Sequence, residues 1–137
     1  MLVLRGGTVV DADADRTIDA TDRYVAPGLI DAHVHLVLDG RADASSLDGE
    51  SATAQGLRAA AHLREAVRAG ITTVRDLGGP PTLAVDAREA VAHGTLAGPR
   101  VVPACSNITM TGGHGHQIGG CEVDGPTEAR KAARRQL

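Results

Sequence analysis

Aromatic side chains are almost absent from this 137-residue chain, in which Tyr24 is the only aromatic residue and there is no Trp or Phe. A folded core must therefore be built from Ala, Val, Leu and Ile, which bury less area per residue than aromatic rings do. Hydrophobic residues still make up 42% of the chain and charged residues 23%. These are ordinary values for a folded chain, and the length allows one domain of common size.

Other absences narrow the setting in which the protein works. Cys105 and Cys121 are too few for a disulfide framework and favour free thiols in a reducing cytoplasm. No apolar run approaches the roughly 20 residues that span a bilayer, and Met1–Arg5 lacks the pattern of a signal peptide. With 14 Lys and Arg against 17 Asp and Glu, the net charge is −3. We therefore expect a cytoplasmic protein that binds neither membrane nor nucleic acid, and association into a homo-oligomer is left open.

The first thirty residues are typical of short strands and turns. Leu2–Leu4 and Thr8–Val10 are rich in β-formers and flank the pair Gly6-Gly7. This pattern predicts a hairpin or a bulge between the two segments. Residues 11–22, rich in Asp, are expected to form a polar connector.

From Leu29 onward the chain alternates between strand and helix patterns. The expected strands are 29–38, 71–74 and 100–106, and the expected helices are 51–69, 80–94 and 126–137. Successive βα units predict a parallel sheet covered by helices. A complete (β/α)8 barrel needs about 250 residues. Two architectures therefore stay open, a small three-stranded α/β unit and the N-terminal part of a larger barrel, and the missing cap after the last helix favours the second.

The helix expected at 51–69 has a defined apolar stripe and a defined end. Ala60, Leu63 and Val67 follow the spacing that places side chains on one helix face. Gly70 then stands where a left-handed residue commonly ends a helix. We expect the stripe to pack against the sheet.

The sharpest motif is the pair of histidines in His33-Val34-His35, on the first of the three strands. Strand alternation would place Asp31, His33 and His35 on one face. The opposite face would hold apolar residues that suit packing under helices: Ile30, Ala32, Val34 and Leu36. Burying the polar set costs several kcal/mol unless something pairs with it. A divalent metal bound by the two imidazoles at the carboxyl end of the strand would satisfy both rings, and the alternative is that hydrogen bonds do so.

Further ligands would be needed, because a catalytic zinc commonly has three protein ligands and one open position. The candidates are His114 and His116 in the Gly-rich loop 111–120, which follows the third expected strand and so lies at the same sheet edge. Three interpretations stay open for this pair: substrate contact, supplementary metal ligation, and solvated side chains in a flexible loop.

Four other polar residues have mainly structural interpretations. His62 and His93 fall on expected helices away from the carboxyl edge, where we expect them to be surface or packing residues. Arg75 and Asp76 end the second strand and are expected to form an ion pair or to contact a substrate, and the ion pair is the commoner case.

Taken together, the motifs carry a resemblance to a known family. The stretch Pro27–His35 resembles the first-strand signature of the metal-dependent amidohydrolase superfamily. Residues 70–78 (Gly-Ile-Thr-Thr-Val-Arg-Asp-Leu-Gly) and 98–102 (Gly-Pro-Arg-Val-Val) are similar to the next two strands of its imidazolonepropionase-like and prolidase-like branch. Residues 111–115 (Thr-Gly-Gly-His-Gly) fit the same branch. The resemblance covers essentially the whole chain.

The resemblance implies a fold and a reaction. Residues 1–27 would belong to a small β-sandwich and residues 28–137 to the first part of a (β/α)8 TIM barrel, with about three βα units. One or two divalent metals, usually Zn2+, would activate a water that attacks an amide-type C–N bond of a dipeptide or a cyclic amide. His33 and His35 match the metal ligands of the first strand, and His114 matches a position that faces the substrate.

The same resemblance also implies parts that this sequence lacks. The family uses a bridging carboxylated lysine or an acidic equivalent, two more histidines and a late aspartate. Lys131, the only lysine, is on the last expected helix and is not a credible bridge. We therefore expect an incomplete part of a hydrolase that is inactive alone. The alternative is a non-catalytic zinc-binding α/β module, closed by the two pairs His33/His35 and His114/His116.

Overall fold

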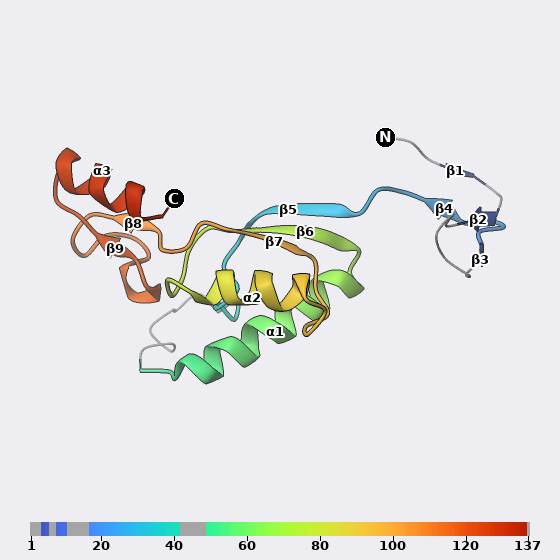
Figure 1. Ribbon diagram of the computed structural model, residues 1–137, viewed down its shortest axis with the longest axis horizontal. Helices are drawn as coiled ribbons and strands as arrows, with labels where there is room; N and C mark the ends of the chain where they lie inside the picture. Colours follow the sequence, from blue (N-terminus) through green and yellow to red (C-terminus); the bar gives the residue numbers. More distant parts are fainter. Residues whose placement is uncertain (1–3, 6–7, 11–16, 42–48, 137) are drawn as a thin grey trace.

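The computed structural model describes residues 4–5, 8–10, 17–41 and 49–136 of the chain. At the N-terminal end it forms two antiparallel strand pairs, one inside the other along the sequence. The outer pair joins β1 (Leu4–Arg5) to β4 (Tyr24–Val25), and the inner pair joins β2 (Thr8–Val10) to β3 (Thr17–Asp19). Both pairs lie well away from the main sheet (Figure 1).

This arrangement corrects two expectations from the sequence. Leu2, Val3 and Gly6-Gly7 lie outside the described residues, and the described parts of the two segments do not pair with each other: β1 takes β4 as its partner and β2 takes β3. Part of the expected polar connector is a strand, β3, and residues 11–16 lie outside the described part of the chain. Local β-propensity indicated β2 correctly and missed β3, and partner choice depends on contacts that are distant in sequence.

The main sheet has three parallel strands, as the alternating pattern predicted. Its order follows the sequence: β5 (Leu29–Val34), β6 (Ile71–Asp76) and β7 (Arg100–Pro103). The crossovers are α1 (Ala52–Arg68) and α2 (Leu83–Ala92), and both helices lie against the same face of the sheet (Figure 1). Parallel strands bring their carboxyl ends to one edge, so the segments that follow β5, β6 and β7 meet there.

Helix α1 begins and ends where its capping residues dictate. The Ser51 hydroxyl accepts a hydrogen bond from the Ala54 backbone N–H at 3.2 Å, which satisfies one free donor of the first turn. At the other end Gly70 has a φ of +85°, a left-handed conformation that glycine adopts without steric cost. The expected boundaries of this helix are confirmed.

The core lies between the two helices and the covered face of the sheet. Its fully buried members come from five elements or their flanking loops: Leu36, Ala59, Leu63, Val74, Ala84 and Val101. The α1 stripe is only partly as expected, because Ala59 rather than Ala60 is buried and Val67 is exposed. Small aliphatic side chains thus form the core of the described residues, as the lack of aromatics required.

Strand β5 departs from the strict alternation expected of it. Its pairing with β6 shifts register between Leu29 and Ile30 and again between Asp31 and Val34. Val34 packs against the core, but Ile30 is 69% exposed and Ala32 is also exposed. The apolar set assigned to one face is therefore split, because each irregularity resets which side chains face the helices.

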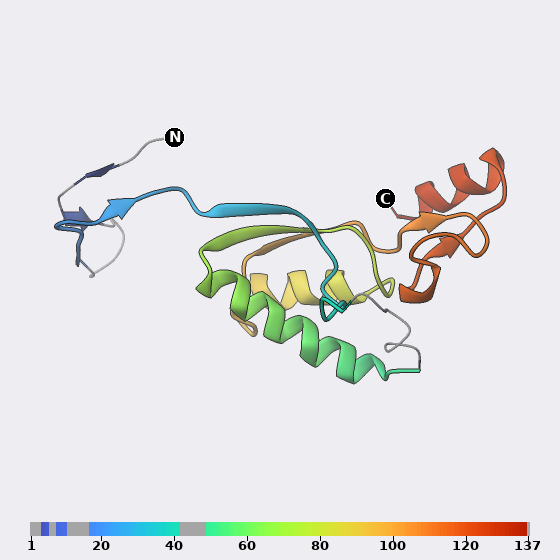
Figure 2. The ribbon, with the colours of Figure 1, turned by 180° about the vertical axis from the view of Figure 1, so that it is seen from behind.

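Beyond the carboxyl edge, residues 108–135 form a smaller unit (Figure 2). Two short parallel strands, β8 (Ile108–Thr109) and β9 (Cys121–Glu122), flank the 3-10 turn η2 (His116–Ile118). The last helix, α3 (Pro126–Arg135), starts with Pro at its first position as expected. None of the helices in the described ranges combines the length and apolar character that crossing a membrane requires.

We predict that Leu63→Ala lowers the free energy of unfolding by about 2–5 kcal/mol, because it leaves a cavity in an aliphatic core with no larger side chain to fill it. Leu63 is only 1% exposed. Leu57→Ala on the same helix is the matched control, since Leu57 is 69% exposed, and it should change stability by about 0.5 kcal/mol or less. Urea unfolding followed by circular dichroism measures both, and equal losses in the two variants would contradict the assignment of the core.

Candidate functional site

The two histidines of the central motif lie together at the carboxyl end of β5. His33 is in the strand and exposed, and His35 directly follows the strand and is half-buried. Their ring centroids are 5.5 Å apart and the ring planes meet at 68°. The Asp31 side chain accepts a hydrogen bond from the His33 backbone N–H at 3.1 Å, so this carboxylate fixes the local backbone.

The His35 ring has a defined orientation. Its Nδ1 donates a hydrogen bond to the backbone carbonyl of Gly78 at 2.8 Å. A carbonyl only accepts, so Nδ1 carries the proton and, in the neutral ring, Nε2 keeps its lone pair. Histidines that ligate metals commonly donate their other ring N–H to a carbonyl or carboxylate in this way. This bond leaves the Nε2 lone pair of His35 as the one through which the ring could bind a metal ion.

Gly78 supplies this carbonyl from a position that only glycine fits. Its φ is +132°, which side-chain-bearing residues rarely adopt, and a Cβ there would lie 2.8 Å from the Asn107 backbone nitrogen. The segment after β6 thereby approaches both the His35 ring and the segment after β7. The segments that follow β5, β6 and β7 thus pack closely together, and this packing positions the Gly78 carbonyl that accepts the hydrogen bond from His35.

Asp76 at the end of β6 is the buried polar residue beside this arrangement, with 2% of its surface exposed. One carboxylate oxygen accepts from the Leu36 backbone N–H and the other from the Gly78 backbone N–H, each at 2.9 Å. Arg75 is exposed, and no ion pair joins it to Asp76 in the described structure. The expected ion pair is wrong, because the carboxylate serves two backbone amides instead.

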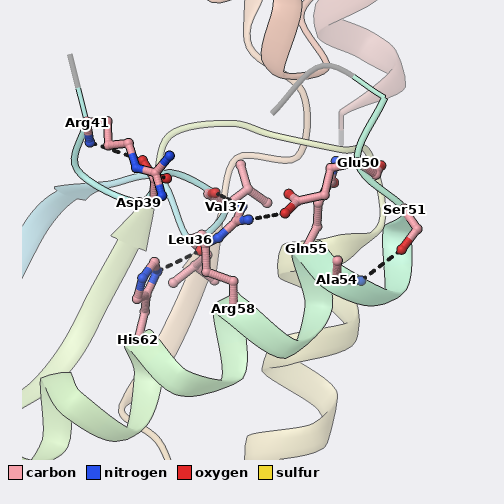
Figure 3. Close-up of polar contacts among 10 residues, drawn as sticks. All are labelled: Leu36, Val37, Asp39, Arg41, Glu50, Ser51, Ala54, Gln55, Arg58 and His62. Atoms are coloured by element: carbon pink, nitrogen blue, oxygen red, sulfur yellow. Dashed lines mark hydrogen bonds and ion pairs between the residues drawn. The ribbon is translucent and has the colours of Figure 1, made fainter. Parts of the chain in front are cut away.

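Helix α1 holds the segment after β5 from the other side (Figure 3). His62 Nδ1 donates to the Leu36 carbonyl at 3.0 Å, and Arg58 Nη1 donates to the Val37 carbonyl at 2.9 Å. Arg58 also pairs with Glu50, and this hydrogen bond raises the pKa of the guanidinium above its usual value. His62 was expected to lie away from the carboxyl edge, and this is wrong: it contacts the residue next to His35.

The i, i+4 spacing of Arg58 and His62 was the signal that could have revealed these contacts, because it puts both on one face of the helix. A cavity of about 460 Å³ opens beside His62, between α1 and the segment after β5, with His35, His62 and Asp39 in its lining. His93, in contrast, bonds the Glu89 carbonyl of its own helix and is exposed, as expected of a surface residue.

The second histidine pair lies in the smaller unit and is not joined to the first. His114 is exposed, and His116 Nδ1 lies 3.7 Å from Glu122 Oε1. Across the described ranges, no three His, Cys, Asp or Glu side chains are grouped so that they could hold a metal ion. The four-histidine site of the zinc-module alternative is therefore not formed.

The Gly-rich loop around His114 is anchored by carboxylates. Thr111 Oγ1 donates to Asp124 at 2.6 Å, and the Thr111 backbone N–H donates to the same carboxylate at 3.3 Å. The Gly112 backbone N–H donates to Glu122 at 2.6 Å. The bonds from Thr111 hold the pKa of Asp124 below its usual value. These contacts fix the start of the loop, which the sequence left open as a flexible one.

Two curated enzymes share part of this sequence. L-hydantoinase from Paenarthrobacter aurescens is 44% identical over 50 residues, which cover 34% of this chain and 11% of that protein. Imidazolonepropionase from Bradyrhizobium diazoefficiens is 40% identical over 50 residues, covering 29% of this chain and 12% of that protein.

Solved structures match nearly the whole chain. A prolidase complexed with N-methylphosphonate-L-proline superposes with a TM-score of 0.72 and 27% identity, over 98% of this chain and 43% of the prolidase. A. niger ochratoxinase gives a TM-score of 0.67 and 28% identity, over 80% of this chain and 30% of that enzyme. The chain thus spans less than half the length of each of these relatives.

A match to one protein family extends over most of the sequence. The sequence profile of the amidohydrolase family matches residues 24–137, which include the main sheet, both crossover helices and the smaller unit. The prolidase and ochratoxinase structures, which cover 98% and 80% of the chain, agree with this match. The chain belongs to the amidohydrolase family.

Proposed function

We propose that this chain is the first part of a metal-dependent hydrolase that cleaves amide-type C–N bonds in dipeptides or cyclic amides. The observation that carries the proposal is the His33/His35 pair at the carboxyl end of β5, with the Nδ1–H of His35 held by Gly78. Membership of the amidohydrolase family and the hydantoinase, imidazolonepropionase and prolidase relatives support amide hydrolysis. Residues 28–137 would begin a (β/α)8 barrel, and residues 1–27 would contribute to a β-sandwich.

The donor set of this chain fits part of a metal site. Two imidazoles with ring centroids 5.5 Å apart match the nitrogen ligands that zinc prefers, and the bond to Gly78 leaves one nitrogen of His35 free. Two ligands do not complete a catalytic site. We propose that the remaining ligands come from later strands of a longer protein.

The residues present have separate tasks in the proposed reaction. A divalent metal, Zn2+ foremost, would lower the pKa of a bound water and polarise the scissile carbonyl. His33 and His35 would hold that metal at the sheet edge, and Gly78 would orient the His35 ring. His114, exposed on its anchored loop, would face a small-molecule amide substrate. The two free thiols, Cys105 and Cys121, are consistent with work in the cytoplasm.

The zinc-module alternative makes a different prediction about the chain alone. A closed site of four histidines would retain one zinc per chain through extensive dialysis. The proposed half-site has only two ligands and would retain almost none. Elemental analysis after dialysis separates the two, and the separation of the histidine pairs in the described structure favours the half-site.

We predict that His33→Ala abolishes zinc binding in a direct titration of the 137-residue chain, because one of two ligands is lost. His33 is exposed, so the free energy of unfolding should change by about 0.5 kcal/mol or less. His93→Ala is the matched control, since it removes an exposed histidine that directly follows α2. Isothermal titration calorimetry measures the binding.

In a longer protein that contains these residues, His33→Ala should also abolish amide hydrolysis. Wild-type zinc binding or full hydrolytic activity in that variant would contradict the proposed role of the pair.

We predict that Thr111→Val raises the pKa of Asp124 toward its ordinary value, because the hydroxyl that donates to the carboxylate is lost. A carboxyl with a lowered pKa in the folded state stabilises the fold above its unfolded pKa, and this contribution is lost as pH falls through the folded pKa. The variant should therefore lose stability near neutral pH and match the wild type in strong acid. Carbon-13 NMR titration measures the pKa; Thr53→Val, on exposed α1 surface, should leave it unchanged.

A further inference from the structure

The peptide group that follows His35 is held from both sides by side chains of other elements. The Leu36 N–H donates to Asp76, at the end of β6, at 2.9 Å. The Leu36 carbonyl accepts from His62, on α1, at 3.0 Å. Backbone groups just beyond a strand end are commonly satisfied by water, and here both are instead fixed by ionisable side chains.

The hydrogen bonds of Asp76 complete a closed ring of contacts that begins and ends at His35. The His35 ring donates to the Gly78 carbonyl, the Gly78 N–H donates to Asp76, and the second oxygen of Asp76 accepts from Leu36, which is bonded covalently to His35. One carboxylate thus fixes both the backbone that carries the imidazole and the residue that orients it. Asp76 has no ion-pair partner in the described structure that would give it another purpose.

His62 fixes the same peptide from the helix layer. It is half-buried, and its bond to the Leu36 carbonyl spans 26 residues of sequence, so it ties α1 to the end of β5. Arg58, one turn earlier, does the same for the next carbonyl, that of Val37 (Figure 3). The segment after β5 therefore cannot rotate without breaking bonds to α1 and β6 together.

We propose that Asp76 and His62 are positioning residues, which lock the peptide after His35 so that its Nε2 is presented to the metal. This inference rests on the proposed function, in which His35 is a metal ligand. A ligand must be held within about 0.5 Å of its productive position. The two side chains supply that restraint from opposite sides of the peptide, through bonds to the Leu36 N–H and the Leu36 carbonyl.

The test compares variants of His62 that keep or remove its donor. His62→Asn retains an amide nitrogen in about the place of Nδ1, whereas His62→Phe keeps a ring of similar volume with no donor. Zinc titration of the 137-residue chain should show about 10- to 100-fold weaker binding for His62→Phe, the usual cost of losing an outer-shell partner. His62→Asn should restore most of the affinity. His93→Phe, which removes only a local bond from an exposed histidine to the Glu89 carbonyl of α2, should have no effect.

A spectroscopic readout separates positioning from folding. Long-range proton–nitrogen NMR at pH 8 reports which ring nitrogen of His35 carries the proton in the neutral ring. Wild type should show the proton on Nδ1, and Asp76→Asn and His62→Phe should show a mixture of both forms. Asp86→Asn, an exposed carboxylate on α2, is the control for the lost charge. His62→Gln, with its amide one carbon farther out, keeps the test decisive if the Phe variant does not fold.

The outcomes distinguish this inference from the function on which it rests. Folded variants that keep the proton on Nδ1 of His35 and bind zinc within twofold of wild type would overturn the positioning role. In a longer protein that contains these residues, zinc binding that is unchanged when His33 and His35 are both replaced by Ala would overturn the proposed metal role of the pair. If the 137-residue half-site binds zinc too weakly for a titration, the NMR readout decides alone whether Asp76 and His62 fix the ring.

Discussion

A buried carboxylate is costly unless it is fully hydrogen-bonded, and the end of β6 places one, Asp76, at 2% exposure. The chain meets that cost with the backbone N–H groups of Leu36 and Gly78, each 2.9 Å from a carboxylate oxygen. The pairing brings the segments after β5 and β6 together, and Gly78 in turn holds the His35 ring. The orientation of a candidate metal ligand thus depends on satisfying one buried charge.

The same arrangement explains why the helices on one face of the sheet matter for chemistry at its edge. Small aliphatic residues form the core, and α1 lies close enough to the segment after β5 for His62 and Arg58 to reach two successive carbonyls, those of Leu36 and Val37. Packing of the aliphatic core therefore fixes the helices against the sheet. Asp76, His62 and Arg58, at the edge of that core, then fix the segment that follows β5 through hydrogen bonds to its backbone. This division, with a scaffold of strands and functional residues on the segments that follow them, is common in parallel α/β folds.

The sequence predicted what depends on local pattern and missed what depends on distant contacts. The helix between Ser51 and Gly70 was predictable because its capping residues are local, and so was the parallel sheet. The pairing of β1 with β4 and the register shifts of β5 were not, since both depend on partners far along the chain. The histidine pair was identified as a candidate from its spacing on a predicted strand that opens a βα repeat, together with the family resemblance. The residues that hold the pair in place were not predicted, because the bond from His35 to Gly78 and the bond from Leu36 to Asp76 join residues about 40 positions apart.

The central claim is that His33 and His35 together bind a divalent metal at the carboxyl end of β5. X-ray diffraction from crystals of the chain soaked in zinc, recorded on both sides of the zinc absorption edge, tests it most directly. The account predicts an anomalous peak within about 2.1 Å of a nitrogen of each ring, with Nε2 as the donor from His35. A peak on His114 or His116 instead, or contact through neither ring of the first pair, would contradict it.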